Sequence, residues 1–282
     1  MSLIDLILNV VGLLLWFNWR AVRFDPLVKT APATLTGTLR RAEPSGFRRW
    51  HLLAALTGLL LLRAQLYWQV GSAVNWNGTV ELGAISISFR TDFFSRTLIF
   101  SFCSFGLAMA VLFLWLLLLS LLKQPAGEGD PLQRLVWLQL GRVDKWSRPV
   151  KAALPFVASS CLWFLASWLL THWALIPRPV SAVHRLEQAA VIGLASYLAW
   201  KYLIVGILLL HVVNSYIYFG NQAFWTPING LARQLLRPLA RAPLRIGKVD
   251  FAPVVVIALV LFLTRLWETG LTALYSKLPI GL

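Results

Sequence analysis

Three polar side chains share one face of an apolar segment in the C-terminal half of the chain. His211, Asn214 and Tyr218 are spaced at i, i+3 and i+7, which places them on one side of a helix. A histidine at membrane depth is a candidate axial ligand of haem or a member of a proton relay, whereas the simpler interpretation is hydrogen bonding between helices. We favour hydrogen bonding, because His51 and His172 lie near span ends and suit His211 poorly as a second haem ligand.

Two arginines and one glutamate also lie within apolar segments. Arg63 and Arg265 each come late in such a segment, from which a long side chain can reach the outer membrane interface. Glu268 follows Arg265 at i+3, so we expect a helical ion pair between them. The simplest role for these groups is structural.

An aspartate precedes the last apolar segment. Asp250 is expected to cap the helix that follows, with Pro253 in its first turn, because a negative charge is favoured at a helix N-terminus. An ion pair of Asp250 with Arg237 or Arg241 would close the preceding link onto the span. Ion binding by Asp250 is the remaining alternative.

Residue patterns typical of catalysis are not evident. The glycines are dispersed without the spacing of a phosphate-binding loop, and no nucleophile–base arrangement or metal-ligand cluster stands out. The two cysteines, Cys103 and Cys161, lie far apart in separate apolar segments, which argues against a disulfide framework or a thiolate metal site. The sequence therefore predicts a protein that is not an enzyme and that uses no metal or cofactor.

The elements that position these residues are long apolar segments. Of the 282 residues 58% are hydrophobic and only 13% are charged, far from the balance of a soluble globular chain. Six segments approach or exceed the length needed to cross a bilayer, at about 3–19, 50–68, 93–122, 149–175, 190–219 and 252–275. The predicted fold is an all-α membrane protein of about six transmembrane helices in three antiparallel pairs.

Basic residues alternate between the links that join these spans. Seventeen Lys and Arg residues fall in the first, third and fifth links and three in the second and fourth. Positive residues stay on the cytoplasmic side, so we expect the odd links inside and both termini outside. The net charge of +15 then reflects topology rather than a groove for nucleic acid, and no direct nucleic-acid partner is expected.

The second link, residues 69–92, is the longest on the outside. Thr79–Leu82 and Ile85–Phe89 flank Gly83-Ala84, a spacing that suits a β-hairpin, although a plain ordered loop is about equally compatible. A lone hairpin is marginally stable, so we expect it to pack on the membrane surface or on a partner.

A short Pro-containing motif recurs after the first, third and fifth spans. It reads Asp25-Pro26-Leu27, Asp130-Pro131-Leu132 and Thr226-Pro227-Ile228, in which Asp or Thr can cap a short helix that has Pro in its first turn. The pattern predicts three degenerate copies of span, basic link and span, at residues 1–68, 93–175 and 187–276.

The link of the third copy has the pattern of an interfacial amphipathic helix that ends before Pro238. Ile228, Leu231 and Leu235 share one helical face, expected in the acyl boundary, while Arg233 and Arg237 share the opposite one. We expect the link arginines to contact anionic lipid head groups or only to fix topology; they are Arg233, Arg237, Arg241 and Arg245.

Residues 225–263 resemble the YggT family. The matching motifs are Thr226-Pro227-Ile228, Leu236-Arg237-Pro238-Leu239 with Arg241, and Gly247-Lys248-Val249-Asp250-Phe251-Ala252-Pro253. This chain departs from the family pattern at Thr226, where Asn is usual, and at Lys248, where a second Gly is usual. The resemblance is strong over about 187–276 and weaker over 93–175, and the first helix pair and the hairpin add to the usual two-pair plan.

The resemblance implies a bacterial inner-membrane protein with an assembly or organising role. The leading hypothesis is a non-enzymatic scaffold or assembly subunit that binds other membrane proteins. The alternatives are a transporter or channel subunit for ions or small solutes, and a haem-handling assembly factor. A stoichiometric partner complex would favour the scaffold, and a continuous water-filled path would favour transport.

Overall fold

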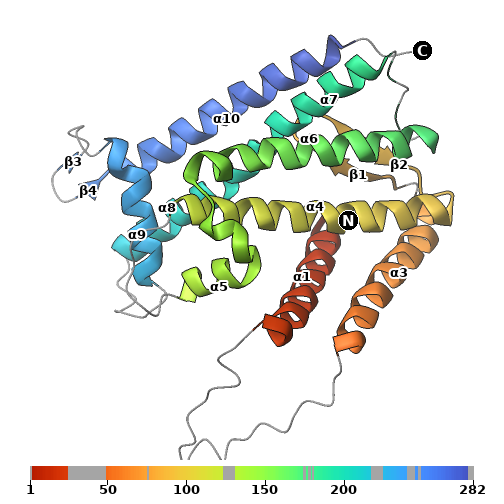
Figure 1. Cartoon of the computed structure of the whole chain (residues 1–282), viewed down its shortest axis with the longest axis horizontal. Coiled ribbons are helices and arrows are strands. Elements are labelled where there is room, and N and C mark those ends of the chain that lie inside the picture. Colours follow the sequence, from red (N-terminus) through yellow and green to blue (C-terminus); the bar gives the residue numbers. More distant parts are fainter. Residues whose placement is uncertain are drawn as a thin grey trace, which may run out of the picture. The chain divides into compact units, whose positions relative to one another are not determined.

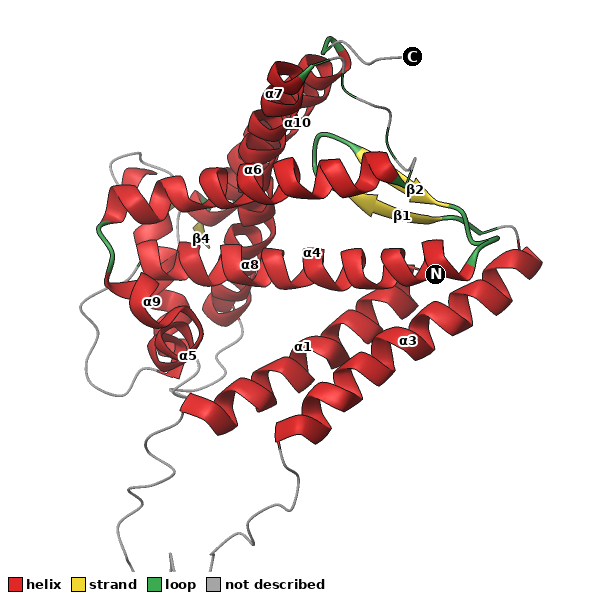
Figure 2. Cartoon of the chain, turned by 45° about the vertical axis from the view of Figure 1, so that its right-hand side comes forward, coloured by secondary structure: helices red, strands yellow, loops and turns green. Residues whose placement is uncertain are grey.

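The structure of the chain is a computed structural model. It describes residues 2–24, 49–74, 76–122, 131–173, 176, 179, 181–216, 225–239, 245–246 and 249–278, almost all of them helical (Figure 2). In chain order the elements are α1 (Ser2–Phe24), α3 (Arg49–Val74), β1 (Gly78–Glu81), β2 (Ser86–Phe89), α4 (Phe94–Leu121), α5 (Pro131–Leu140), the 3₁₀ helix η2 (Gly141–Lys145), α6 (Arg148–His172), α7 (Ala182–Ala195), the 3₁₀ helix η3 (Ser196–Ala199), α8 (Trp200–Tyr216), α9 (Trp225–Leu236), the 3₁₀ helix η4 (Arg237–Leu239), β3 (Arg245–Ile246), β4 (Val249–Asp250) and α10 (Ala252–Ser276) (Figure 1).

Five helical segments within the described residues are long and apolar enough to cross a membrane. They are Leu3–Arg20 in α1, Phe94–Leu121, Arg148–His172, Ala182–Ser215 and Ala252–Ser276. The all-α fold is confirmed, and the architecture is that of a multi-pass membrane protein. The segment predicted as a span at 50–68 folds as helix α3 but is not among the five, because Arg63, Gln65 and Gln69 interrupt its apolar run.

The fourth of these segments is longer than the sequence predicts. Helix α7 begins at Ala182 rather than near residue 190, because Ser181 caps it by accepting a hydrogen bond from the backbone N–H of His184 at 3.3 Å. It continues through η3 into α8, and the resulting candidate span Ala182–Ser215 has 34 residues, about 50 Å at the rise of an α-helix. This exceeds the hydrocarbon thickness of about 30 Å.

The described chain divides into two compact units, and the division falls within α4. The first unit contains residues 1–80 and 88–110, with α1 and α3 side by side (Figure 1). Its apolar core joins Leu56 and Leu60 of α3 to Phe105 of α4, and Leu13 and Trp16 of α1 pack against this cluster.

The second unit contains residues 81–87 and 111–282. Helix α6 packs along α7, while α10 packs along α8 and α7. The α6–α7 contact is close because Gly193 has no side chain: a Cβ there would collide with Oγ of Ser160 and lie 2.8 Å from the carbonyl oxygen of Phe156. Small residues allow such close backbone approach between membrane helices.

Strands β1 and β2 form a hairpin in the segment where the sequence leaves a hairpin and a plain ordered loop equally open. The N–H of Leu82 donates to the carbonyl of Ile85 at 2.8 Å, and Gly83 adopts φ +78°, a left-handed conformation that favours glycine. The turn packs against helices of the same chain. Gly83 lies against Ala195 of α7 and Leu198 of η3, since a Cβ at Gly83 would be 3.2 and 3.1 Å from their side chains.

Two short link helices, α5 and α9, bury one face each in the second unit. Val136 of α5 packs beneath Leu116 of α4, and Ala232 of α9 packs with Leu208 of α8 and Val256 of α10. Val136 and Ala232 each lie five residues after the proline of the repeated motif, so the second and third copies share a local architecture. Protein side chains therefore cover part of the apolar face of α9, where Ile228 is buried and Leu231 and Leu235 are half-buried, and contact of this face with the acyl boundary stays a prediction.

Candidate functional site

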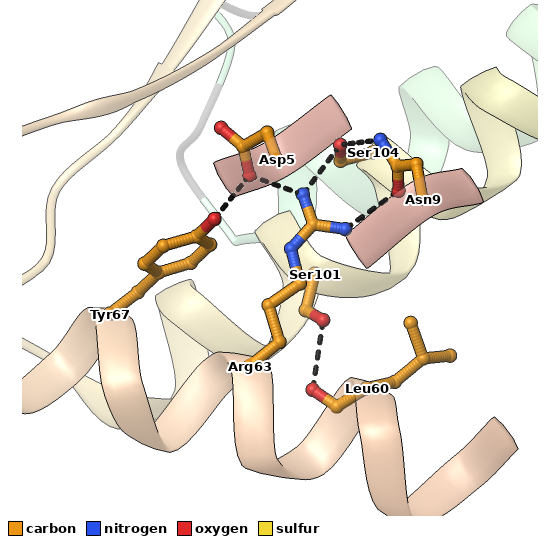
Figure 3. A network of polar contacts seen from close by, with 7 residues as sticks. All are labelled: Asp5, Asn9, Leu60, Arg63, Tyr67, Ser101 and Ser104. Carbon is orange, nitrogen blue, oxygen red and sulfur yellow. Dashed lines mark hydrogen bonds and ion pairs between the residues drawn. The ribbon is translucent and has the colours of Figure 1, made fainter. Parts of the chain in front are cut away.

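Among the described residues of the first unit, the most deeply buried charge is Arg63 of α3, whose side chain is 1% exposed. Its Nη2 lies 2.6 Å from Oδ1 of Asp5 and donates to Oγ of Ser104 at 2.8 Å, while its Nη1 donates to Oδ1 of Asn9 at 2.7 Å (Figure 3). Asp5 and Asn9 come from α1 and Ser104 from α4. One guanidinium thus bonds three helices together.

Aromatic groups complete this network. Oη of Tyr67 donates to the same Asp5 oxygen at 2.5 Å, and the Arg63 guanidinium carbon lies 5.5 Å from the ring centroids of both Tyr67 and Phe100. Of the three guanidinium nitrogens of Arg63, only Nε lacks a hydrogen-bond partner among the described residues. The prediction that Arg63 extends to the outer interface is wrong, because the carboxylate, amide and hydroxyl around it hold it inside the helix cluster.

The chemistry available to this network is structural. The charges of Arg63 and Asp5 neutralise each other, so the cluster presents no net charge to a ligand. A buried ion pair is retained only where hydrogen bonds satisfy its remaining groups, which Asn9, Ser104 and Tyr67 do here.

A second buried polar cluster lies where α4, η2 and α6 meet, and sequence reasoning missed it. Oγ of Ser120 donates to Oδ1 of Asp144 at 2.6 Å, and Nζ of Lys151 donates to Oγ of Ser120 at 2.9 Å and to the carbonyl of Asp144 at 3.1 Å. All three residues are buried. The sequence signal that could have revealed this cluster is Lys151, because a lysine three residues inside an apolar helix needs a polar partner.

The polar stripe of α8 serves, in part, to join helices. Nδ1 of His211 lies 2.8 Å from Oδ1 of Asn229, which connects α8 to α9. Oδ1 of Asn214 is buried and has no hydrogen-bond partner among the described residues, and Tyr218 lies outside them. Within the described part of the chain, no three His, Cys, Asp or Glu side chains are placed to hold a metal ion.

A charged groove runs between α8 and the second half of α10. Its volume is about 790 Å³, and the lining residues are Lys201, Leu261, Thr264, Arg265, Glu268, Thr269, Thr272, Ala273 and Ser276. Oε2 of Glu268 lies 3.3 Å from Nζ of Lys201, so the carboxylate pairs with α8 rather than with Arg265 as the i+3 spacing predicts. The contact of Glu268 with α8 has replaced the predicted pair with Arg265 inside α10. Arg265 is exposed along the groove.

The link into α10 differs from the predicted cap. Asp250 lies in β4, where it pairs with Arg245 of β3 in the backbone register, and Phe251 is the N-cap residue without a side-chain capping bond. Pro253 occupies the first turn of α10, as expected. The N-cap position therefore lies one residue after Asp250, whose side chain is outside the described part of the structure, and its contribution to the cap stays a prediction.

The remaining motif residues fall on α9 and around it. Helix α9 begins at Trp225, so Thr226 lies in its first turn beside Pro227 and not at the predicted cap position. Arg237 and Pro238 lie in η4 directly after it. Pro131 begins α5. Several predicted positions lie outside the described residues: Asp25, Pro26, Asp130, Arg241 and Gly247.

Comparison with known proteins gives no match to a family model, a curated protein or a solved structure. The resemblance to the YggT family therefore stays a prediction that rests on the motifs around Pro227, Arg237 and Pro253.

Proposed function

We propose that the chain is a non-enzymatic integral membrane scaffold or assembly subunit that binds partner membrane proteins within the bilayer. The observation that carries the proposal is the charged groove on the flank of α10. Large apolar side chains of this helix are exposed around it, among them Phe262, Leu266 and Trp267, as expected for contact with lipid. Arg265 and Glu268 interrupt that surface.

A charged side chain against lipid near the centre of a helix is costly, about 2.5–3.5 kcal/mol on insertion scales. By contrast, the cations Arg63 and Lys151 are buried and hydrogen-bonded within the chain. Arg265 is open instead. A partner protein that covers the groove would remove this cost, and that expectation favours an assembly subunit over a chain that works alone.

The proposed topology has six spans in three antiparallel pairs, with α3 as the second span, both termini outside and the basic links at the cytoplasmic face of a bacterial inner membrane. Arg233 of α9 and Arg237 of η4 are exposed, whereas Ile228 and Ala232 of α9 are buried. This placement supports contact with anionic head groups, worth about 1 kcal/mol per basic residue near the surface. A YggT-like organising role agrees with this topology.

The test of the scaffold is purification of the tagged chain from its native membranes in mild detergent, followed by mass spectrometry of co-migrating proteins. We expect a stoichiometric complex with at least one other membrane protein. A chain that migrates alone, or only with itself, contradicts the proposal and favours a transporter or channel.

The topology has a separate test. In a background with Cys103→Ser and Cys161→Ser, we expect Arg90→Cys to react with a membrane-impermeant maleimide in intact cells. Arg233→Cys should react only after the cells are opened. The reverse pattern would overturn the orientation without bearing on the scaffold.

A further inference from the structure

The lining of the groove follows the spacing of a helix–helix interface. Leu261, Arg265, Glu268 and Thr272 of α10 are separated by four, three and four residues, which places them on one seam of the helix. Thr269 and Ala273 extend the seam with the small–x–x–x–small spacing that lets membrane helices approach closely. This spacing is that of a helix face against which one further helix can pack.

The hydroxyl groups of the groove are already satisfied. Thr264 donates to the carbonyl of Val260 at 2.7 Å, Thr269 to that of Arg265 at 2.9 Å, and Thr272 to that of Glu268 at 2.9 Å. Their donors are therefore used within α10, and their surfaces serve close packing. Recognition by charge falls to Lys201, Arg265 and Glu268.

The net charge of the groove favours a helix that carries a carboxylate over a second copy of this chain. Lys201 and Glu268 offset each other across 3.3 Å, so the positive charge of Arg265 remains. A helix with one carboxylate would bring the sum to zero. A second copy of this chain would bring another groove of charge +1, and the total would rise.

The position of Arg265 along α10 argues against a lipid phosphate as the occupant of the groove. Arg265 lies 13 residues after Ala252 and 11 before Ser276, about 20 and 17 Å from the two ends of α10. Phosphates of the bilayer lie outside a hydrocarbon core about 30 Å thick, so in the proposed topology, with α10 centred in the bilayer, they lie about 15 Å from the middle of this helix. A carboxylate on a membrane-spanning helix can be placed at that depth.

From these observations we infer that the groove between α8 and α10 receives one transmembrane helix of a partner protein, and that a Glu or Asp near the middle of that helix pairs with Arg265. The inference rests on the proposed scaffold function and specifies how the partner is recognised.

The test uses the full chain, reconstituted in phosphatidylcholine vesicles, and a synthetic poly-leucine helix with one central Glu as the probe. We expect energy transfer between labelled chain and probe, with affinity at least tenfold higher than for the same peptide with Gln. Arg265→Gln should abolish this preference, whereas Arg96→Gln, the same substitution on α4, should leave it unchanged. The comparison of Glu and Gln peptides on the unaltered chain holds even if a variant fails to fold.

Equal binding of the two peptides overturns the inference. So does self-association of the chain that Arg265→Gln abolishes, or loss of Glu-peptide binding when phosphatidylglycerol is added at constant salt, which would assign the groove to lipid phosphate. A native partner complex that survives Arg265→Gln overturns the inference alone, whereas failure to find any complex overturns the scaffold itself.

Discussion

Removal of Asp5 is the most informative perturbation of the first unit. The carboxylate faces Nη2 of Arg63 at 2.6 Å and accepts from Oη of Tyr67 at 2.5 Å. Asp5→Leu therefore leaves a buried cation without its counter-charge, although Asn9 and Ser104 still accept hydrogen bonds from it. Asp5→Asn keeps an acceptor oxygen in place and removes only the charge.

The expected magnitudes follow from this geometry. Breaking a buried ion pair by removal of one partner costs about 3–5 kcal/mol, and we expect Asp5→Leu to lower the free energy of unfolding by that amount. Asp5→Asn should cost about half as much, because the acceptor survives. The double variant Asp5→Leu with Arg63→Met should recover most of the loss, since it buries no unpaired charge.

Reversible unfolding in dodecylmaltoside titrated with dodecylsulfate measures these differences, with helicity as the readout. Arg90→Gln is a suitable control, because Arg90 forms an exposed pair with Asp92 at 2.7 Å and should contribute less than about 1 kcal/mol. If the double variant were less stable than Asp5→Leu alone, Arg63 would be stabilising without Asp5, and the ion pair would not be the reason for its burial.

Three further predictions concern the second unit. Gly193→Ala should separate α7 from α6 and lower the unfolding free energy by about 1–3 kcal/mol, whereas Gly206→Ala, with open space around it, should be neutral or slightly stabilising in the same titration. Lys151→Met should cost about 3 kcal/mol by leaving the buried polar groups of its cluster without their cation, and a loss below 1 kcal/mol would contradict its role there. Asn229→Ala should cost only about 0.6–1.7 kcal/mol, since it removes one interhelical hydrogen bond to His211; a fivefold larger loss would point to a further role for that pair.

The sequence predicts well what depends on neighbouring residues. Apolar length locates the helices, the Gly83 turn locates the hairpin, and the motif proline marks the start of α5 and lies within the first turn of α9. Each of these follows from local backbone preferences or from a run of apolar side chains. Helix α7 is the partial exception, because Arg185, Glu187 and Gln188 lower its hydropathy while Ser181 still starts a helix.

Partners of charged side chains are harder to predict. Arg63 bonds to Asp5, 58 residues away, and Glu268 bonds to Lys201, 67 residues away, because the rotation and depth of packed helices bring them together. Neither quantity can be obtained from spacing along one helix. For the same reason the sequence does not predict the contact of Lys151 with Ser120, nor the packing of α8 and α10 against the apolar face of α9.

The ion pair between α1 and α3 also bears on how the chain is made. Helix α3 carries Arg63, Gln65 and Gln69 within its apolar run, so its release from the translocon into lipid by itself is unfavourable. Helix α1 emerges from the ribosome first and carries the matching Asp5. In the six-span topology proposed above, pairing with α1 offsets the charge of Arg63, and α3 resides in the bilayer as one half of a neutral pair of helices.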